Sequence, residues 1–361
     1  MKYHFVAFIT VAIWGSTFVF TKMLLQAGLS PAQIFTLRFI IAYVLLLCYS
    51  FLRNKVTSSP PKFLDEPSGK AERGGVRGGL NKRKKEADQT PSGSPYSGGE
   101  NKSSFRLFSA SWRDELLMIA LGITGGSLYF LTENAAMLFT TATNTSLIVC
   151  SCPLFAMLLF ALFFRQSEKI TRVQALGSLV AFLGMAVVVL NGHFVLHLSP
   201  LGDLLAFGAC LCWAVYSLLM KAAVSGYSSL FITRKVFIYG LLTIIPYYIL
   251  VPSEASIFIS PSSFLFPLST FLNLLFLGVV ASMLCYLTWN WVIGKLGPVI
   301  ATNWVYFNPI TTILFAWWLL DEKITIWFLL GSALILMGMY LADRQKSEKM
   351  STKDTKDTKK T

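Results

Sequence analysis

The tetrapeptide Glu168-Lys169-Ile170-Thr171 occurs a second time in the chain, as Glu322-Lys323-Ile324-Thr325. The flanking sequence repeats with it: an asparagine and a proline stand 19 residues apart ahead of each copy, and glycines follow each glutamate by 9 and 16 residues. The matching residues are Asn134, Pro153, Gly177 and Gly184 in the first half, and Asn290, Pro309, Gly331 and Gly338 in the second. Agreement at several fixed distances indicates an internal duplication.

Long apolar runs fill both halves of this duplication. Of the 361 residues, 54% are hydrophobic and 14% are charged, whereas a soluble domain carries about 25% charged residues. An apolar run of about 20 residues is long enough to cross a bilayer as a helix. We therefore predict an all-α integral membrane protein with ten transmembrane helices, at residues 4–25, 33–52, 115–136, 140–163, 172–190, 201–221, 231–250, 268–291, 300–320 and 324–342.

Residues 53–113 differ from the rest of the chain. They are rich in Ser, Pro, Gly and Lys, and their 13 basic and 6 acidic residues contribute +7 to a net charge of +13. A segment with so few large apolar residues cannot order itself, so we predict a disordered basic cytoplasmic insert here and a disordered basic tail at 343–361. Contact of the insert with anionic lipid stays open as a second interpretation. Because most of the basic charge lies outside the spans, no nucleic-acid partner is predicted.

The charges of the connecting loops predict the orientation, since Lys and Arg accumulate on the cytoplasmic side. Basic residues gather in the loops after even-numbered spans and are few after odd-numbered spans. Both termini are therefore predicted to be cytoplasmic. Each half holds five spans, an odd number, so the second half enters the membrane from the opposite side. The prediction is two inverted five-helix repeats, residues 1–52 with 114–192, and residues 200–342, an arrangement that suits alternating access around a central site.

Aromatic and polar residues recur at matching places in the two halves. Tyr129 and Glu133 stand four apart in one predicted helix, as Tyr286 and Asn290 do in its counterpart, and such a pair shares one helix face. We predict a cavity for a small amphipathic solute. Its candidate lining residues are Trp14, Thr17, Thr21, Arg38, Tyr129, Glu133, Asn134, Asn144, Trp213, Tyr216, Tyr286, Asn290, Asn303 and Tyr306. Helix–helix hydrogen bonding stays open as the alternative role of the asparagines.

Other residues within the spans have more specific predicted roles. Arg38 is placed to pair with Glu133 or to meet an anionic group. Pro153 and Pro309 each remove a helix hydrogen bond and kink a span, and freed carbonyls, together with Asn308, could face the cavity. The four glycines of the duplication are predicted close-packing positions in the fifth and tenth helices, either within the bundle or between copies: Gly177, Gly184, Gly331 and Gly338.

No cofactor, metal site or enzymatic activity is predicted. The six cysteines all fall in apolar runs, no CxxC motif occurs and the chain has three histidines, whereas a metal site needs clustered ligands. The sequence contains no phosphate-binding loop, nucleophile elbow or HExxH motif. Any driving force for transport must therefore come from ions, protons or solute gradients.

These motifs resemble the EamA-type, ten-helix members of the drug/metabolite transporter superfamily. The resemblance rests on Trp14-Gly15-Ser16, Asn134-Ala135-Ala136, Pro153-Leu154-Phe155-Ala156, Asn308-Pro309-Ile310 and the two Glu-Lys-Ile-Thr copies with their glycines. It covers all ten predicted spans but not the insert, which has 61 residues where the family usually has a short loop. It implies a central cavity lined by helices one, three, four, six, eight and nine. It also implies transport, often outward, of amino acids, metabolites, toxic cations or sugar derivatives.

The hypothesis from the sequence is a multi-pass transporter of the plasma membrane, embedded in the lipid bilayer. It would be a secondary transporter, an exporter of small organic metabolites such as amino acids or drug-like solutes, working by alternating access. Glu133 is the candidate for proton coupling, with solute exchange as the other possibility. A non-transporting membrane scaffold or sensor that acts through the basic insert is the alternative function. The oligomeric state stays open.

Residues 168 and 322 are predicted to lie on opposite sides of the membrane. In a variant without the native cysteines, Glu168→Cys should react with a membrane-impermeant thiol reagent from the cytoplasmic side and Glu322→Cys from the outer side. Labelling of intact cells and of inverted vesicles measures this directly. Reaction of both positions from one side would contradict the inverted repeat.

Overall fold

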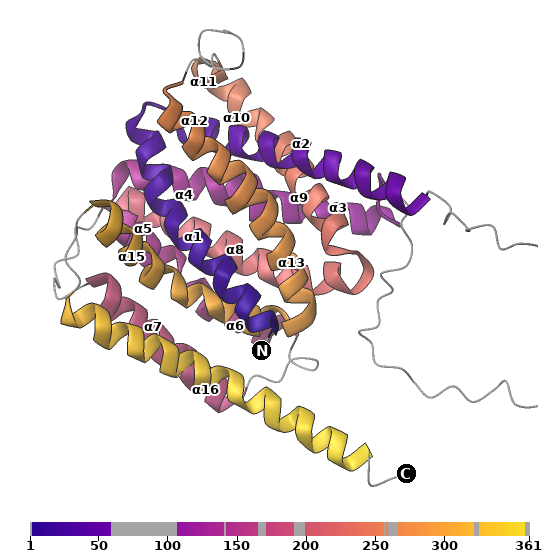
Figure 1. Ribbon diagram of the computed structural model, residues 1–361, viewed down its shortest axis with the longest axis vertical. Coiled ribbons are helices and arrows are strands. Elements are labelled where there is room, and N and C mark those ends of the chain that lie inside the picture. The colour runs from indigo at the N-terminus through magenta and orange to yellow at the C-terminus, as the bar shows by residue number, and fades with distance from the viewer. Residues whose placement is uncertain are drawn as a thin grey trace, which may run out of the picture. The chain divides into compact units, whose positions relative to one another are not determined.

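The computed structural model describes residues 2–58, 107–140, 142–164, 171–190, 199–255, 258, 266–320 and 325–357. All regular secondary structure in these residues is helical (Figure 1). Contacts divide the chain into two compact units, Met1–Cys48 with Arg106–Thr361, and Tyr49–Phe105. The first unit is the helical bundle. The predicted insert at 53–113 falls largely outside the described residues, and so do Glu168 and Glu322.

The helices follow the apolar runs of the sequence. In the first half they are α1 (Lys2–Gln26), α2 (Pro31–Ser58), α3 (Trp112–Gly122), η1 (Ile123–Ser127), α4 (Leu128–Phe139), α5 (Ala142–Val149), α6 (Cys152–Phe163) and α7 (Arg172–Leu190). In the second half they are α8 (Pro200–Gly226), α9 (Ser229–Thr243), α10 (Ile245–Leu250), α11 (Pro252–Ala255), α12 (Leu268–Leu275), η4 (Phe276–Leu284), α13 (Cys285–Leu296), α14 (Pro298–Asn303), η5 (Trp304–Phe307), α15 (Asn308–Leu320) and α16 (Ile326–Asp357).

Six helical stretches of the described chain are long and apolar enough to cross a membrane. They are Lys2–Gln26, Pro31–Leu52, Trp112–Phe139, Pro200–Gly226, Ser229–Leu250 and Leu268–Leu296. Shorter apolar helices cover Cys152–Phe163, Arg172–Val187 and Leu329–Ala342. Large apolar side chains are exposed on these helices, among them Leu162, Leu176, Leu204, Leu330 and Leu336, as expected where lipid rather than water surrounds a protein. The composition and the exposed side chains agree with an integral membrane protein.

Several of the spans are interrupted rather than continuous. A π-helical segment, η1, separates α3 from α4, and a second, η4, separates α12 from α13. Within η1, Gly126 leaves the helical region with φ −130° and ψ −106°. Pro153 lies in the first turn of α6, after the break that ends α5 at Val149, and Pro309 lies in the first turn of α15, after the 3₁₀ segment η5. The two prolines thus begin helices, where their missing N–H costs little.

Two helices extend beyond the spans read from the sequence. The structure places residues through Asp357 in α16, where a disordered tail from residue 343 was predicted, and it continues α2 to Ser58, past residue 52. A helix that already exists can grow at its end without the costly nucleation step. Residues 344–350, Arg-Gln-Lys-Ser-Glu-Lys-Met, are mostly residues of high helix propensity, which favours the extension of α16.

A buried ion pair joins α3 to α9. The Lys235 ammonium contacts the Glu115 carboxylate, and the exposed fractions of the two side chains are 5% and 9%. Tyr239 donates its hydroxyl to the same carboxylate, and the backbone N–H of Ser109 donates at 2.7 Å. A buried carboxylate is tolerated only when charges and hydrogen bonds compensate it, so this cluster fixes the start of α3 against α9.

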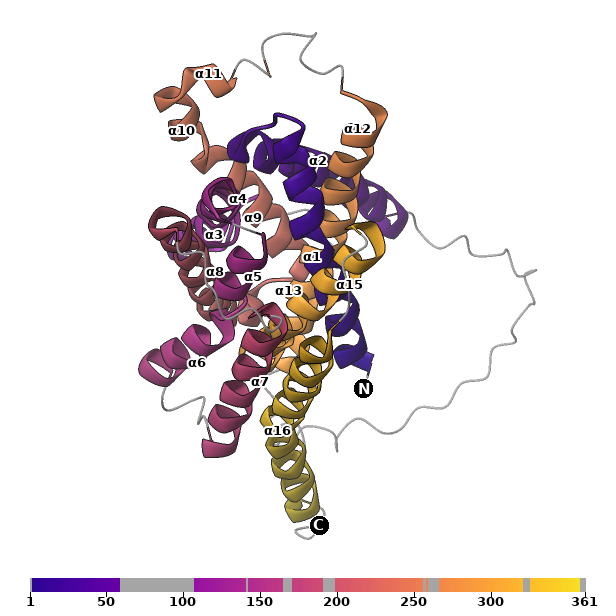
Figure 2. The same ribbon diagram turned by 90° about the vertical axis from the view of Figure 1, so that its left-hand side faces the viewer.

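Helix α7 runs beside α16, a contact that both views show (Figure 1, Figure 2). Glycines bring the two backbones together: a Cβ added to Gly177 would lie 2.6 Å from the backbone nitrogen of Ala342, and one added to Gly184 would lie 2.6 Å from that of Ile335. The oxygen of Gly331 lies 2.8 Å from the latter position. A Cβ on Gly338 would overlap the backbone of Ala181. Small residues allow this close approach of helices in lipid.

Gly338→Ala is expected to lower the free energy of unfolding by about 1–3 kcal/mol, the usual cost of overpacking. The matched control is Gly208→Ala in α8, where the nearest atom to an added Cβ is 3.9 Å away. That variant should be neutral or more stable, because alanine favours the helix by about 1 kcal/mol over glycine. Thermal unfolding of the purified protein in detergent measures both. Equal stability of the two variants would contradict the close packing of α7 on α16.

Candidate functional site

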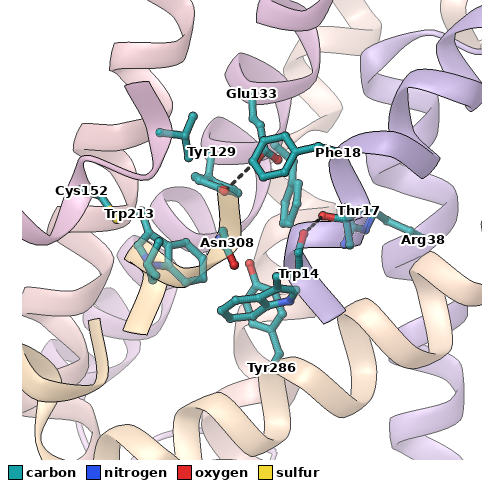
Figure 3. Close-up of a pocket in the computed structure, with 13 residues that line it drawn as sticks. Trp14, Thr17, Phe18, Arg38, Tyr129, Glu133, Cys152, Trp213, Tyr286 and Asn308 are labelled. Carbon is teal, nitrogen blue, oxygen red and sulfur yellow. Dashed lines mark hydrogen bonds between the residues drawn. The ribbon is translucent and has the colours of Figure 1, made fainter. Parts of the chain in front are cut away.

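A pocket lined by thirteen described residues lies within the bundle (Figure 3). Helices from both halves of the chain form its wall. Seven of the residues predicted from the sequence line it: Trp14, Thr17, Arg38, Tyr129, Glu133, Trp213 and Tyr286. Six further residues complete the lining: Phe18, Phe130, Val149, Cys152, Val305 and Asn308. Arg38 belongs to α2, the second span, which was not among the helices that the family resemblance implied for the cavity. None of the described lining residues comes from α7 or α16.

Six of the thirteen lining residues are aromatic. The ring of Trp213 lies 5.3 Å from that of Trp14, at an interplanar angle of 89°, and 5.1 Å from that of Tyr129. Tyr286 packs on Trp14 with 5.8 Å between ring centroids. Edge-to-face contacts of this kind stabilise a ring cluster beyond its burial alone. The pocket therefore presents a preformed apolar surface to a solute.

The irregular segments of the helices hold two of these rings in place. The indole Nε1 of Trp14 donates a 2.9 Å hydrogen bond to the backbone oxygen of Ala281, within η4. The hydroxyl of Tyr286 donates to the backbone oxygen of Gly125, within η1. Irregular backbone in a membrane protein needs such partners because no water is available. Each π-helical segment is therefore bonded to a ring of the pocket.

An arginine and a glutamate face the pocket from different helices (Figure 3). On α4, Glu133 accepts a 2.8 Å hydrogen bond from the hydroxyl of Tyr129, one turn earlier. On α2, Arg38 donates from Nε to the Ser282 hydroxyl at 2.9 Å, and its Cζ lies 4.3 Å from the centroid of the Phe130 ring. Among the described residues, the ion pair within 4.0 Å is that of Lys235 with Glu115. Arg38 and Glu133 lie farther apart than that and interact electrostatically without direct contact.

Several predicted cavity residues instead make contacts between helices. Asn134 donates a 3.2 Å hydrogen bond to the backbone oxygen of Pro31, so it joins α4 to α2. Asn303, in α14, accepts a 3.2 Å hydrogen bond from Ser178 of α7. These residues are buried, and the pocket is lined by their neighbours. For both asparagines the structure favours the helix–helix alternative over cavity lining.

Asn290 and Tyr216 form a buried network away from the pocket wall. The Tyr216 hydroxyl donates to Asn290 Oδ1 at 2.6 Å, and Asn290 Nδ2 donates to the Thr233 hydroxyl at 2.9 Å. The network links α8, α13 and α9. Two remaining predicted residues, Thr21 and Tyr306, are also buried outside the pocket lining. Asn144 belongs to α5, but its side chain lies outside the described residues.

The lining residues that were not predicted differ in how visible they are in the sequence. Phe18 and Phe130 follow predicted pocket residues by four positions and one position, so helical spacing and neighbourhood could have suggested them. Asn308 stands directly before Pro309. The sequence analysis named it as a residue that could face the cavity but did not count it among the candidate lining residues. Cys152 carries no such signal, because a cysteine in an apolar run reads as a packing residue.

The Tyr216–Asn290 bond is expected to stabilise the bundle by an amount typical of hydrogen bonds between membrane helices, about 0.6–1.7 kcal/mol. Asn290→Leu removes the partner of a buried hydroxyl and should lower the unfolding free energy. The double variant Tyr216→Phe with Asn290→Leu should lose less than the sum of the single variants. Unfolding of the four proteins in mixed detergent measures the coupling. Strictly additive losses would contradict a direct bond.

Comparison with known proteins agrees with this architecture. The chain is 24% identical over 349 residues to an uncharacterized transporter of Archaeoglobus fulgidus, covering 96% of this chain and 99% of that protein. It is 27% identical to a probable terminal-alkyne amino-acid exporter of Streptantibioticus cattleyicolor, covering 64% of this chain and 74% of the relative. It is 26% identical to a probable amino-acid metabolite efflux pump of Escherichia coli, covering 62% and 75%.

A solved crystal structure superimposes with a TM-score of 0.61 at 17% identity, covering 95% of this chain and 96% of the other, which shows the shared fold. The EamA-like transporter family model matches residues 1–65, 100–190 and 200–342. These ranges cover both predicted halves and leave out most of the insert. The chain therefore belongs to the EamA-like transporter family and is a transmembrane transporter of the drug/metabolite transporter superfamily.

Proposed function

We propose that this protein is a secondary transporter that exports small organic metabolites, such as amino acids or drug-like solutes, by alternating access. The central observation behind the proposal is the pocket in which Arg38, Glu133 and a group of aromatic rings meet. Apolar walls with a few convergent polar groups are typical of small-molecule sites. The names of two relatives, an amino-acid exporter and an amino-acid metabolite efflux pump, favour this solute range and the outward direction.

The proposed transporter has ten membrane-spanning helices in two inverted repeats, with both termini in the cytoplasm and the chain in the plasma membrane. The matching positions of η1 and η4 support the repeat: with Asn134 aligned on Asn290, the two π-helical segments overlap. The pairing of basic loops with even-numbered spans supports the orientation. The helices would rock around the pocket, while the chain itself performs no catalysis.

Two polar clusters lie at opposite ends of the α9–α10 span and would close the two sides of the pocket in turn. At one end, Lys235 binds Glu115. At the other end, Glu254 accepts hydrogen bonds from the hydroxyls of Ser30 and Tyr247, and its backbone oxygen accepts one from Gln33. The hydrogen bonds of the Glu254 cluster are part-buried and can exchange with water at modest cost. The Lys235–Glu115 contact is buried, so its opening would require water to enter and solvate both groups. This arrangement supports alternating rather than simultaneous opening.

Purified protein in liposomes should accelerate the flux of at least one member of a broad amino-acid and drug panel over empty liposomes. In the proposed mechanism Glu133 exchanges the coupling proton, because it is the carboxylate among the described pocket residues. A glutamine cannot exchange a proton, so Glu133→Gln should reduce flux driven by a pH gradient at least about tenfold, within the usual effect of removing a proton-transfer group.

The matched control is Asp203→Asn at the start of α8, where the side chain accepts from the backbone N–H of Ser199 and is not among the pocket-lining residues. An asparagine oxygen can keep that hydrogen bond, so flux should stay at the wild-type level. Absence of flux across the whole panel would contradict transport. Full pH-driven flux in Glu133→Gln would contradict the coupling role and leave transport itself standing.

A further inference from the structure

We propose that Asn308 is a specificity-determining residue of the pocket, and that its side-chain oxygen Oδ1 accepts a hydrogen bond from an uncharged N–H or O–H group of the transported solute. The inference rests on the transport function proposed above and assigns one contact of that solute. Asn308 lines the pocket, and the exposed fraction of the residue is 6%. Figure 3 shows its side chain on the pocket wall together with those of Trp213 and Tyr286.

The surroundings of Asn308 hold its side-chain amide in one orientation. Its Nδ2 donates to the sulfur of Cys150 at 3.7 Å. Its backbone oxygen accepts from the hydroxyls of Thr311 and Thr312, at 2.8 and 3.0 Å, which ties the residue to the start of α15. An amide carries its nitrogen and its oxygen on the same carbon in fixed, divergent directions. The contact of Nδ2 with Cys150 therefore directs Oδ1 away from that sulfur.

The oxygen Oδ1 of Asn308 is a buried acceptor that lacks a hydrogen-bond partner in the part of the chain that the structure describes. The indole Nε1 of Trp213, another lining residue, is a buried donor in the same situation. A polar atom that has lost its water without gaining a partner is costly, and it gains the full value of a hydrogen bond on meeting one. A solute that fills the pocket is well placed to supply the missing partner.

The charged residues of the pocket favour an uncharged donor. Arg38 and Glu133 interact electrostatically, so each partly compensates the other. A cationic group of the solute that bound Asn308 would lose its hydration and gain only a neutral amide as its partner, which is unfavourable. The N–H or O–H of an amide, an alcohol or a heterocycle loses much less hydration on burial. The neutral acceptor of Asn308 therefore matches a neutral donor.

Benzamide and acetophenone test this contact on the purified full-length protein. Both molecules have a phenyl ring and a carbonyl group, but the amide nitrogen of benzamide, which carries two N–H donors, is replaced by a methyl group in acetophenone. Titration calorimetry gives the affinity of each probe, and partition of each probe into protein-free micelles corrects for their different hydrophobicity. After this correction the wild-type protein should bind benzamide at least about fivefold more tightly than acetophenone, the effect of one hydrogen bond.

Three variants separate solute recognition from folding. Asn308→Leu removes the acceptor and keeps the approximate size, so the ratio of the two affinities should fall to about one through weaker binding of benzamide. Asn308→Asp keeps an acceptor oxygen in either protonation state and should keep the preference for benzamide. The matched control is Asn134→Leu, because Oδ1 of Asn134 is also buried without a partner among the described residues, but Asn134 is not a lining residue. That variant should keep the wild-type ratio, whatever its stability.

Several outcomes overturn the assignment. An unchanged ratio in Asn308→Leu would show that water, and not the solute, satisfies Oδ1. Equal weakening of both probes in Asn308→Leu and in Asn308→Asp would show a role in structure alone. If Asn308→Leu fails to fold, the corrected wild-type ratio decides by itself, and a value below about two overturns the proposal. Absence of benzamide binding to the wild-type protein in the millimolar range overturns it as well.

Flux in liposomes distinguishes failure of this inference from failure of the transport function. If Asn308→Leu transports members of the amino-acid and drug panel at wild-type rates, including those with uncharged N–H or O–H groups, the inference fails and the transporter stands. Absence of flux across the whole panel in the wild-type protein removes both.

Discussion

Burial of charge in an apolar bundle is the constraint on which the rest of this structure depends. Each charged group inside the helices must find compensation from a neighbour, a backbone group or a ligand. Glu115 receives an ammonium, a phenol hydroxyl and a backbone N–H from three separate residues. Among the described residues, Arg38 receives a hydroxyl and an aromatic face, and it interacts electrostatically with Glu133 of the same pocket. The need to compensate buried charge thus holds α3 against α9, and it places polar groups on the pocket wall.

Irregular backbone connects the shape of the pocket to the packing of the helices. The segments η1 and η4 interrupt spans in the two halves, and their carbonyls accept from the pocket residues Tyr286 and Trp14. A rotation of either ring would leave a carbonyl unsatisfied in an apolar surrounding, which costs free energy. These two hydrogen bonds therefore stabilise the irregular backbone and at the same time fix the orientation of the two rings. Distortions of this kind inside helices frequently occur at functional sites.

Helices α7 and α16 have a different role from the helices around the pocket. Their glycines allow backbone contact along one seam, and no described pocket residue comes from either helix. Close backbone packing leaves few alternative arrangements of this pair. Asn303, bonded to Ser178 of α7, joins this pair to the α14 region of the bundle. In the proposed rocking motion, this closely packed pair would support the helices around the pocket.

The sequence by itself determined which segments are helical and which residue types could meet a solute. Apolar runs decide this because the backbone in lipid must satisfy its own hydrogen bonds, and the internal duplication identified Trp14 with Trp213, and Tyr129 with Tyr286, as related aromatic positions. Only the tertiary structure decided in which direction each of two consecutive residues points. Glu133 faces the pocket whereas Asn134 bonds to α2, because adjacent residues on a helix point about 100° apart. The rotation of each helix about its axis is set by packing against the other helices. Whether an asparagine lines the pocket, as Asn308 does, or joins helices, as Asn290 does, is therefore decided only in the assembled bundle.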